Sequence, residues 1–209
     1  IFKPESGESL ARPEMPRPLY VREVGAYIIA EAIGINDFVP ITVLREHNGE
    51  IVSAQEKIVG AEEFPLYDFW SKSDVALPSS VIKGALLDAV IGNTDQHEYN
   101  IIKSGDEIYG IDHGFSMPDH QISGRKMRGT GSAFEDLIAS NNKSSTGITS
   151  GQRESLNNFL HDKKTEKILR ILFKDAPKSV DMMYRRVTKI LELGHFQTSK
   201  WHNWSGAGE

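Results

Sequence analysis

Residues 91–118, IGNTDQHEYNIIKSGDEIYGIDHGFSMP, decide the fold predicted for this chain. Two short apolar runs in this stretch are separated by Ser-Gly-Asp at 104–106, which predicts two strands joined by a tight turn. A loop that ends at Asn100 would lead into the first strand, and the second strand would bring Asp112 back beside it. Together with Asp95, these residues would place carboxylate and amide oxygens at one end of a hairpin. Such an oxygen-rich site suits Mg²⁺, which usually takes few protein carboxylates together with substrate phosphates.

The order and spacing of these polar residues match the catalytic loop of kinases. Four residues separate Asp95 from Asn100. The same spacing separates the kinase aspartate that orients the attacking hydroxyl from the asparagine that holds a metal ion. Asp112, His113 and Gly114 follow the second predicted strand, where kinases carry the metal-binding Asp-Phe-Gly run. A polar hairpin with a structural Asp/Asn turn is the alternative explanation of this stretch.

One branch of kinases matches the order of the residues more closely. The run at 95–101, Asp-Gln-His-Glu-Tyr-Asn-Ile, resembles the Asp-Arg-His-x-x-Asn-Ile run of the phosphatidylinositol 3-/4-kinases, in which the histidine follows the aspartate. Gln96 stands where that family has arginine, and His113 stands where kinases have phenylalanine. The resemblance implies a small bilobal protein-kinase-like fold that transfers a phosphate from ATP in the presence of Mg²⁺.

The same resemblance implies a role for each polar residue. Asp95 would position or deprotonate the acceptor hydroxyl, and His97 would contact the transferring phosphate or assist proton transfer. Asn100 and Asp112 would hold Mg²⁺, which neutralises charge between the β- and γ-phosphates. A transition-metal site built from His97, His113 and Asp112 is an alternative that the hard oxygen ligands and the Asp–Asn spacing disfavour.

The first residues predict the nucleotide-binding side of the site. Residues 1–4 indicate the end of an edge strand, and residues 19–33 indicate a helix with one apolar face. In the related kinases a strand lysine binds the α- and β-phosphates and pairs with a glutamate on the following helix, and Lys3 and Glu23 have the right order for these roles. A surface lysine and an exposed helical glutamate are the alternative. Resemblance to small bacterial phosphatidylinositol 3-/4-kinase-like proteins extends to residues 2–4, 22–27 and 39–45.

Two further strands are predicted at 38–45 and 50–57, around the hairpin turn Asn48-Gly49. By position, the end of the second strand would contact the adenine through Gln55, Glu56, Lys57 and Ile58. Only two residues precede Lys3 in this sequence. The two strands and the glycine-rich loop that normally cover the phosphates are therefore absent from it, and the N-lobe is predicted to be truncated.

The second half of the chain predicts a mostly helical lobe. A helix from about 80 to 91 has a wide apolar face and would support the catalytic loop. Residues 116–130 would form the activation segment, and its basic residues would contact an anionic substrate; a solvated basic loop is the alternative. These basic residues are Arg125, Lys126 and Arg128. Further helices are predicted at 133–140, 152–160, 166–173 and 179–193.

These elements predict an α+β fold with a partial, strand-rich N-lobe at 1–58. A mostly helical C-lobe at 59–194 would carry the catalytic loop and the activation segment, and residues 195–209 would form a tail. The sequence does not indicate an oligomeric state.

Composition narrows the possible functions. The net charge of −5 argues against nucleic-acid binding, and no apolar run is long enough to cross a membrane. The absence of cysteine excludes disulfides and thiolate zinc sites.

We expect a cytoplasmic protein, and delivery into another cell as an effector stays open. We therefore expect an ATP- and Mg²⁺-dependent kinase that acts on a protein or a phosphoinositide. A catalytically inactive pseudokinase, serving as a nucleotide-binding or protein-interaction module, is the alternative function.

Overall fold

The computed structural model describes residues 1–8, 18–66, 68, 74–119 and 132–198. Two small antiparallel sheets and a larger set of helices make up these residues, which confirms the predicted α+β class. The smaller strand-rich part and the larger helical part have the organisation expected of a small bilobal, kinase-like fold. Arg125, Lys126 and Arg128, the predicted substrate contacts, lie outside the described residues. Among the described residues, no helix is long and apolar enough to cross a membrane.

The first sheet carries the predicted nucleotide-binding lysine. Strands β1 (Phe2–Pro4), β3 (Glu50–Gln55) and β2 (Thr42–His47) pair antiparallel in that order. The β2–β3 turn uses Asn48 at φ 52° and Gly49 at φ 80°, the positive φ values that a two-residue hairpin turn requires. Strand β1 lies at the edge of the sheet, and Lys3 faces Ser53 of β3 in the register. A short 3-10 helix, η1 (Glu5–Gly7), follows β1.

The second sheet contains the predicted hairpin. Strands β5 (Ile101–Ser104) and β6 (Glu107–Gly110) pair antiparallel, as expected, and the turn between them contains Gly105 at φ 60°. Strand β4 (Glu62–Glu63) adds to the other edge of β5. The sequence pattern predicted no strand at these residues. Two consecutive exposed glutamates carry no strand signal, and β4 forms because β5 offers an edge to pair with.

Six helices stand against these sheets in the part of the chain that the structure describes. They are α1 (Leu19–Ala32), α3 (Ser79–Ile91), α4 (Ala133–Ser140), α5 (Ser150–His161), α6 (Lys163–Leu172) and α7 (Pro177–Leu193). Helices α5 to α7 begin two to three residues earlier than predicted. Thr149 and Gln152 form a capping box before α5, Asp162 caps α6, and Pro177 occupies the first position of α7. Two further 3-10 turns, η2 (Glu98–Asn100) and η3 (His113–Phe115), flank the β5–β6 hairpin.

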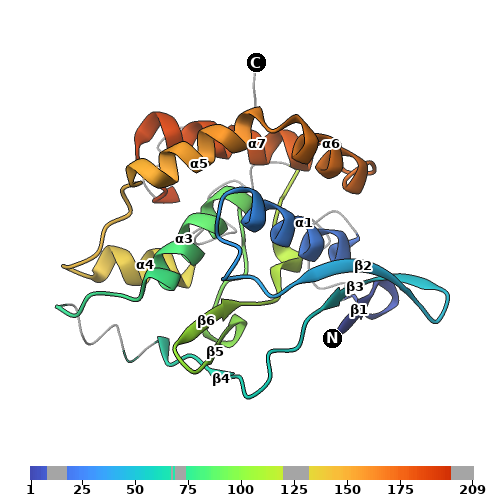
Figure 1. Ribbon diagram of the computed structural model, residues 1–209, viewed down its shortest axis with the longest axis horizontal. Coiled ribbons are helices and arrows are strands. Elements are labelled where there is room, and N and C mark those ends of the chain that lie inside the picture. Colours follow the sequence, from blue (N-terminus) through green and yellow to red (C-terminus); the bar gives the residue numbers. More distant parts are fainter. Residues whose placement is uncertain (9–17, 67, 69–73, 120–131, 199–209) are drawn as a thin grey trace.

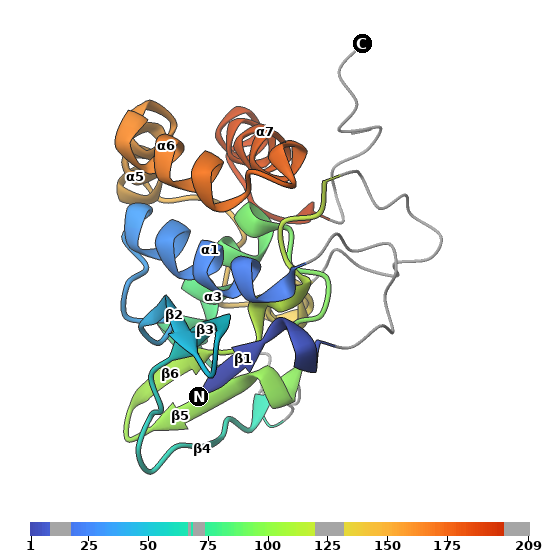
Figure 2. The same cartoon turned by 90° about the vertical axis from the view of Figure 1, so that its right-hand side faces the viewer.

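The helices form two tiers above the sheets. Helices α5, α6 and α7 make the upper tier in Figures 1 and 2, and α1 and α3 lie between them and the strands. Helix α1 contacts β2 and β3 on one side and α3 and α6 on the other. The buried apolar residues form one cluster that includes Ile29 of α1, Leu86 of α3 and Val187 of α7. The core is therefore continuous across the predicted lobe boundary at 58–59, and the division into lobes stays a prediction.

The chain after α7 packs on the body before the described residues end at 198. His195 forms an isolated β-bridge with Gly147, and the Phe196 side chain is fully buried in the hydrophobic cluster. The Thr198 hydroxyl donates a 2.8 Å hydrogen bond to Oε2 of Glu135 in α4. Residues 195–198, predicted as the start of a tail, are thus part of the fold. Phe196 has no periodic partner in the sequence, because it packs against the tertiary core.

A buried arginine fixes the end of α3, where the predicted catalytic loop begins. Gly92 caps the helix in the left-handed conformation, at φ 61°. The Arg186 guanidinium of α7 donates to the last helical carbonyls, those of Val90 and Ile91, at 2.9 and 3.2 Å. A Cβ at position 92 would lie 2.8 Å from Cζ of Arg186. Only glycine therefore fits between the helix end and this arginine.

Candidate active site

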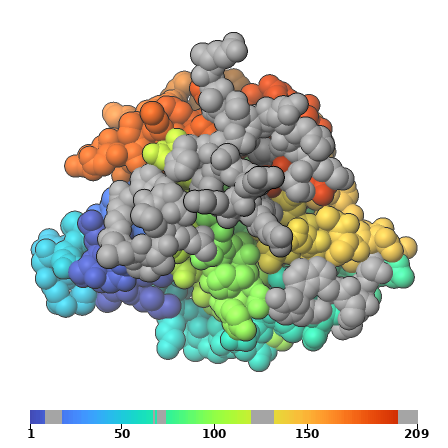
Figure 3. Space-filling model, turned by 180° about the vertical axis from the view of Figure 1, so that it is seen from behind, coloured from blue at the N-terminus to red at the C-terminus, as the bar shows by residue number. Residues whose placement is uncertain are grey.

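Three predicted site residues from distant parts of the chain meet at one ammonium group. Nζ of Lys3 lies 2.6 Å from Oε1 of Glu23 and 2.9 Å from Oδ1 of Asp112. Lys3 comes from β1, Glu23 from α1, and Asp112 from the residues between β6 and η3. In Figure 3 the N-terminal segment (blue) lies beside the segment that contains the predicted loop and hairpin (green). The resemblance to kinases implied that these three residues meet, and the structure brings them together.

The backbone around Asp112 holds the three residues in place. Asp112 adopts the left-handed conformation at φ 61°, which aspartate tolerates better than most residues. The next amide, N–H of His113, donates a 3.0 Å hydrogen bond to Oε2 of Glu23. Glu23 therefore binds the lysine with one oxygen and the turn with the other. Arg22, its neighbour in α1, is buried and donates to the carbonyls of Ser116 and Met117, which fixes the start of the predicted activation segment.

Burial and charge act differently on the three groups. Burial alone would lower the pKa of Lys3, but the carboxylates of Glu23 and Asp112 raise it above its ordinary value. Burial raises the pKa of Glu23 despite the neighbouring ammonium. Burial would raise the pKa of Asp112 as well, but attraction and hydrogen bonding to Lys3 outweigh it and lower that pKa. Lys3 and Asp112 are therefore both charged at neutral pH.

The predicted catalytic loop is held by its own asparagines. Nδ2 of Asn100 donates a 3.0 Å hydrogen bond to the backbone carbonyl of Asp95. Oδ1 of Asn93, at the other end of the loop, accepts a 3.1 Å hydrogen bond from the Asp95 amide N–H. The backbone of Asp95 is thus bound on both sides. The Asn100 backbone carbonyl accepts from Ile111 at 2.9 Å, which joins the loop to the residues just before Asp112.

The two histidines of this region have different surroundings. His97 is half-buried, its Nδ1 has no hydrogen-bond partner in the structure, and its ring packs edge-on against Tyr99. His113 is fully buried, and neither ring nitrogen has a hydrogen-bond partner. Burial lowers the pKa of His113 to about 4, and the Lys3 ammonium acts in the same direction. His113 therefore remains neutral at physiological pH and is a buried packing residue.

The predicted adenine-contact residues lie at and after the end of β3. The Gln55 amide donates to the Ile1 carbonyl at 2.8 Å, and the N-terminal amine of Ile1 donates back to the Gln55 carbonyl at 2.8 Å. The buried Gln55 side chain donates a 3.0 Å hydrogen bond to the Thr42 hydroxyl. These bonds use the backbone groups and the side-chain nitrogen of Gln55 within the fold. The Glu56 amide likewise donates to the Ile41 carbonyl at 2.8 Å. Adenine contacts by Gln55, Glu56, Lys57 and Ile58 stay a prediction.

A cavity adjoins the three-residue cluster. Residues of β1, η1, α1 and η3 enclose about 340 Å³, with Lys3, Glu23 and Asp112 in its lining. This volume falls in the range of small-molecule sites. The Asp112 side chain is 56% exposed, so its carboxylate is accessible. No cluster of three or more His, Asp or Glu side chains suited to a metal occurs among the described residues. Asp112 supplies an accessible carboxylate oxygen, which Mg²⁺ accepts together with phosphate oxygens and water. Asn100, the other predicted ligand, is not among the residues that line this cavity, so the metal site stays a prediction.

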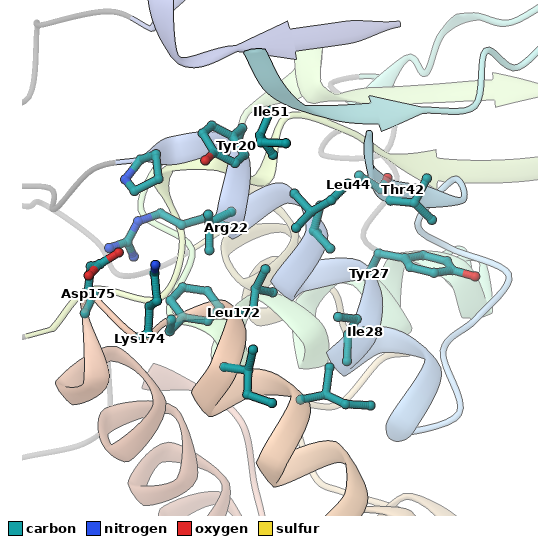
Figure 4. Close-up of a pocket in the computed structure, with 18 of the residues that line it drawn as sticks. Tyr20, Arg22, Tyr27, Ile28, Thr42, Leu44, Ile51, Leu172, Lys174 and Asp175 are labelled. Atoms are coloured by element: carbon teal, nitrogen blue, oxygen red, sulfur yellow. The ribbon is translucent and has the colours of Figure 1, made fainter. Parts of the chain in front are cut away.

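A larger cavity, of about 670 Å³, lies on another side of α1. Figure 4 shows that α1, the β2–β3 sheet and the end of α6 line it, mostly with apolar side chains such as Leu44, Ile28 and Leu172. Arg22, Lys174 and Asp175 gather at one end. None of the predicted site residues that the structure describes lines this cavity. By volume alone, this cavity would be the better candidate for a ligand site. We favour the smaller cavity, because its lining contains the charged groups that a phosphate or a metal ion needs.

The sequence did not single out two residues that the structure places beside the catalytic loop. Asn93 holds the Asp95 amide, and the buried Asp88 of α3 accepts a 3.0 Å hydrogen bond from Nδ2 of Asn93. One feature of the sequence could have pointed to Asp88: it is an aspartate between Leu87 and Ala89, on the apolar face of a predicted helix. A carboxylate at such a position is seldom there for packing.

Comparison with known proteins adds little to this geometry. No family model matches the chain, and no curated protein matches it significantly. Among solved structures, it is similar to the crystal structure of a Helicobacter pylori proinflammatory kinase, CtkA. That match has a TM-score of 0.42 and 13% sequence identity, and it covers 88% of this chain and 83% of the other. The functional proposal therefore rests on the geometry of the site.

Proposed function

We propose that this chain is an ATP- and Mg²⁺-dependent phosphotransferase of the phosphatidylinositol 3-/4-kinase-like type. The observation that carries the proposal is the contact of Lys3 with both Glu23 and Asp112 at 2.6 and 2.9 Å. An isolated surface lysine does not need a buried glutamate behind it. This glutamate holds the ammonium beside the cavity, where it can meet an anionic ligand.

Each residue would have one task in the transfer. Lys3, held by Glu23, orients the triphosphate through its α- and β-phosphates. Asp95 orients the acceptor hydroxyl and takes its proton as the hydroxyl oxygen forms a bond to the γ-phosphorus. The bond between that phosphorus and the oxygen bridging to the β-phosphate breaks, and ADP leaves with the electron pair. The backbone bonds from Asn93 and Asn100 keep Asp95 in position for this step.

Asn100 and Asp112 would hold the magnesium ion, which neutralises the charge that develops on the phosphate oxygens. The hydrogen bond from Nδ2 of Asn100 to the Asp95 carbonyl orients the side-chain amide. Its other polar atom, Oδ1, is the one suited to a cation. Asp112 is charged and accessible, as a metal ligand must be.

The acceptor would be a hydroxyl of a protein or a phosphoinositide. The fold alone does not choose between them. Arg125, Lys126 and Arg128 would contact an anionic acceptor if they lie along the activation segment as proposed. Assays therefore need both kinds of acceptor.

The decisive experiment compares the wild-type chain with Asp95→Asn, using labelled ATP. Phosphoinositide vesicles and a protein lysate serve as acceptors. We expect the variant to bind ATP normally but to lose roughly 10²- to 10⁴-fold in transfer rate, because it cannot accept the proton. Asp106→Asn, an exposed position in the β5–β6 turn, is the matched control and should keep full activity. Equal background labelling by wild type and Asp95→Asn on every acceptor would overturn the proposal and favour an inactive nucleotide-binding module.

A further inference from the structure

Asp88 is buried at the end of α3 and is linked to the predicted catalytic loop by hydrogen bonds. Its Oδ1 accepts from Nδ2 of Asn93 at 3.0 Å, and its backbone carbonyl accepts from the Asn93 amide at 2.9 Å. Oδ1 of Asn93 in turn accepts from the Asp95 amide at 3.1 Å. One side chain therefore separates the buried carboxyl of Asp88 from the backbone of Asp95.

The same two residues contact the remainder of the loop and the start of α4. Nδ2 of Asn93 also lies 3.3 Å from Oε1 of Gln96, and the Gln96 carbonyl accepts from the Ala133 amide at 3.3 Å. Ser132, the residue that caps α4, acts to lower the pKa of the Asp88 carboxyl, whose Oδ2 is buried without a hydrogen-bond partner in the structure. Asp88 thus lies where α3, the loop and the first turn of α4 meet.

A carboxyl group at this point costs stability. Transfer of a charged group from water into a protein interior is unfavourable unless hydrogen bonds compensate for it. Burial raises the pKa of Asp88 to about 7, while the hydrogen bond from Asn93 and the neighbouring Ser132 side chain act in the opposite direction. The charged groups packed against this end of α3 are Glu135 of α4, which raises the pKa further, and Arg186 of α7, which binds the carbonyls of Val90 and Ile91.

We propose that Asp88 is a positioning residue, which fixes the backbone of Asp95 through the Asn93 side chain. This inference rests on the proposed phosphotransferase function. As a carboxylate, Asp88 forms a charge-assisted hydrogen bond with the Asn93 amide, and such bonds are roughly twice as strong as neutral ones. That bond orients the amide, so that its oxygen faces the Asp95 N–H. The orientation of the catalytic carboxylate then depends on a group that touches neither ATP nor the acceptor.

The test uses Asp88→Asn, a change of nearly equal shape, in the complete chain. Loss of the charge should lower kcat about 5- to 10-fold at pH 8, the effect of weakening one charge-assisted hydrogen bond. KM for ATP should not change, because Lys3, Glu23 and Asp112 are untouched. Wild-type kcat should fall as the pH drops through about 7, the pKa of Asp88, and this step should be missing in the variant. Asp37→Asn, which affects an exposed ion pair with Lys83, is the control.

A second variant and a second readout separate positioning from general stability. If Asp88 acts through Asn93, the double variant Asp88→Asn/Asn93→Ala should have the same kcat as Asn93→Ala alone. Hydrogen exchange at the amides of Asp95 and Gln96 should accelerate in Asp88→Asn, while exchange in α5 stays unchanged. Acceleration in both regions, or additive effects on kcat, would show a merely structural role and overturn the inference.

The exchange measurement also keeps this inference separate from the proposed function. If wild type transfers no phosphate, the phosphotransferase proposal fails, and selective acceleration at Asp95 still demonstrates that Asp88 positions the loop. If wild type is active and Asp88→Asn changes neither kcat nor exchange, this inference fails while the proposed function stands.

Discussion

Nζ of Lys3 lies 2.9 Å from Oδ1 of Asp112, although 109 positions separate the two residues in the chain. The contact joins the edge strand of the first sheet to the residue that follows the hairpin of the second sheet. Glu23, 20 positions after Lys3, completes the cluster from α1. The site therefore forms only when both sheets and α1 are in place, so its chemistry reports on the whole fold.

Removal of the lysine charge should destabilise the protein through Glu23. Lys3→Met leaves the buried Glu23 carboxylate without its cation, and we expect a loss of about 1–3 kcal/mol in the free energy of unfolding. Urea denaturation of wild type and Lys3→Met measures this difference in the free energy of unfolding. Lys83→Met, whose partner Asp37 is exposed, should cost less than about 1 kcal/mol. Lys3→Met/Glu23→Gln should recover part of the loss, and no recovery would mean that Glu23 does not depend on Lys3.

The metal assignment predicts a change in how ATP binds. In Asp112→Ala, we expect calorimetry to give the same ATP affinity with Mg²⁺ and with excess chelator, because the charged ligand is gone. Wild type should bind more tightly with Mg²⁺. Identical wild-type affinities in the two conditions would contradict the assignment of Asp112 to the metal.

The buried carboxyl of Asp88 should make stability depend on pH. Its pKa is about 7 in the folded protein against an ordinary 3.8, so the folded state releases this proton later than the unfolded state as the pH rises. Below pH 3.8 the group costs nothing. Between about pH 4 and 7 wild type should lose stability relative to Asp88→Asn, by up to about 4 kcal/mol. Thermal unfolding of both proteins across this range measures the difference, and parallel pH curves would refute it.

Two glycines in helices should respond oppositely to alanine. A Cβ at Gly84 of α3 would lie 2.6 Å from Phe38 and 2.7 Å from Phe134, both buried, so Gly84→Ala should cost about 1–3 kcal/mol. At Gly151, in the first turn of α5, nothing lies within 4 Å. Gly151→Ala should therefore be neutral or stabilise by up to about 1 kcal/mol. The denaturation midpoints of the two variants, compared with wild type, measure this difference. Equal shifts of the two midpoints would contradict the close packing around Gly84 of α3.

Local patterns predicted the elements that their own residues determine. The β5–β6 hairpin follows from two apolar runs and a turn containing Gly105, and α7 follows from one apolar stripe that ends at Gly194. The meeting of Lys3, Glu23 and Asp112 was predictable only through the resemblance to kinases, because no local rule joins residues so far apart.

Tertiary contacts decided what the sequence could not predict. Strand β4 needs the edge of β5, and the burial of Phe196 needs the assembled core. The link from Asp88 to Asp95 depends on how one asparagine side chain turns after the end of α3. The first two features depend on partners that are distant in the sequence, and the third depends on a side-chain conformation. Residue periodicity contains neither kind of information.

The fit of Arg186 against Gly92 constrains how related sequences can diverge. A side chain at position 92 meets the guanidinium at 2.8 Å, and loss of the arginine removes the side-chain donor to the carbonyls of Val90 and Ile91. The Ile91 carbonyl keeps the Met117 amide as a donor. Neither position can change first without a penalty, although 93 residues lie between them. The two residues should therefore be inherited together, and a lineage that replaces Arg186 gains freedom at position 92 only after another donor reaches the end of α3.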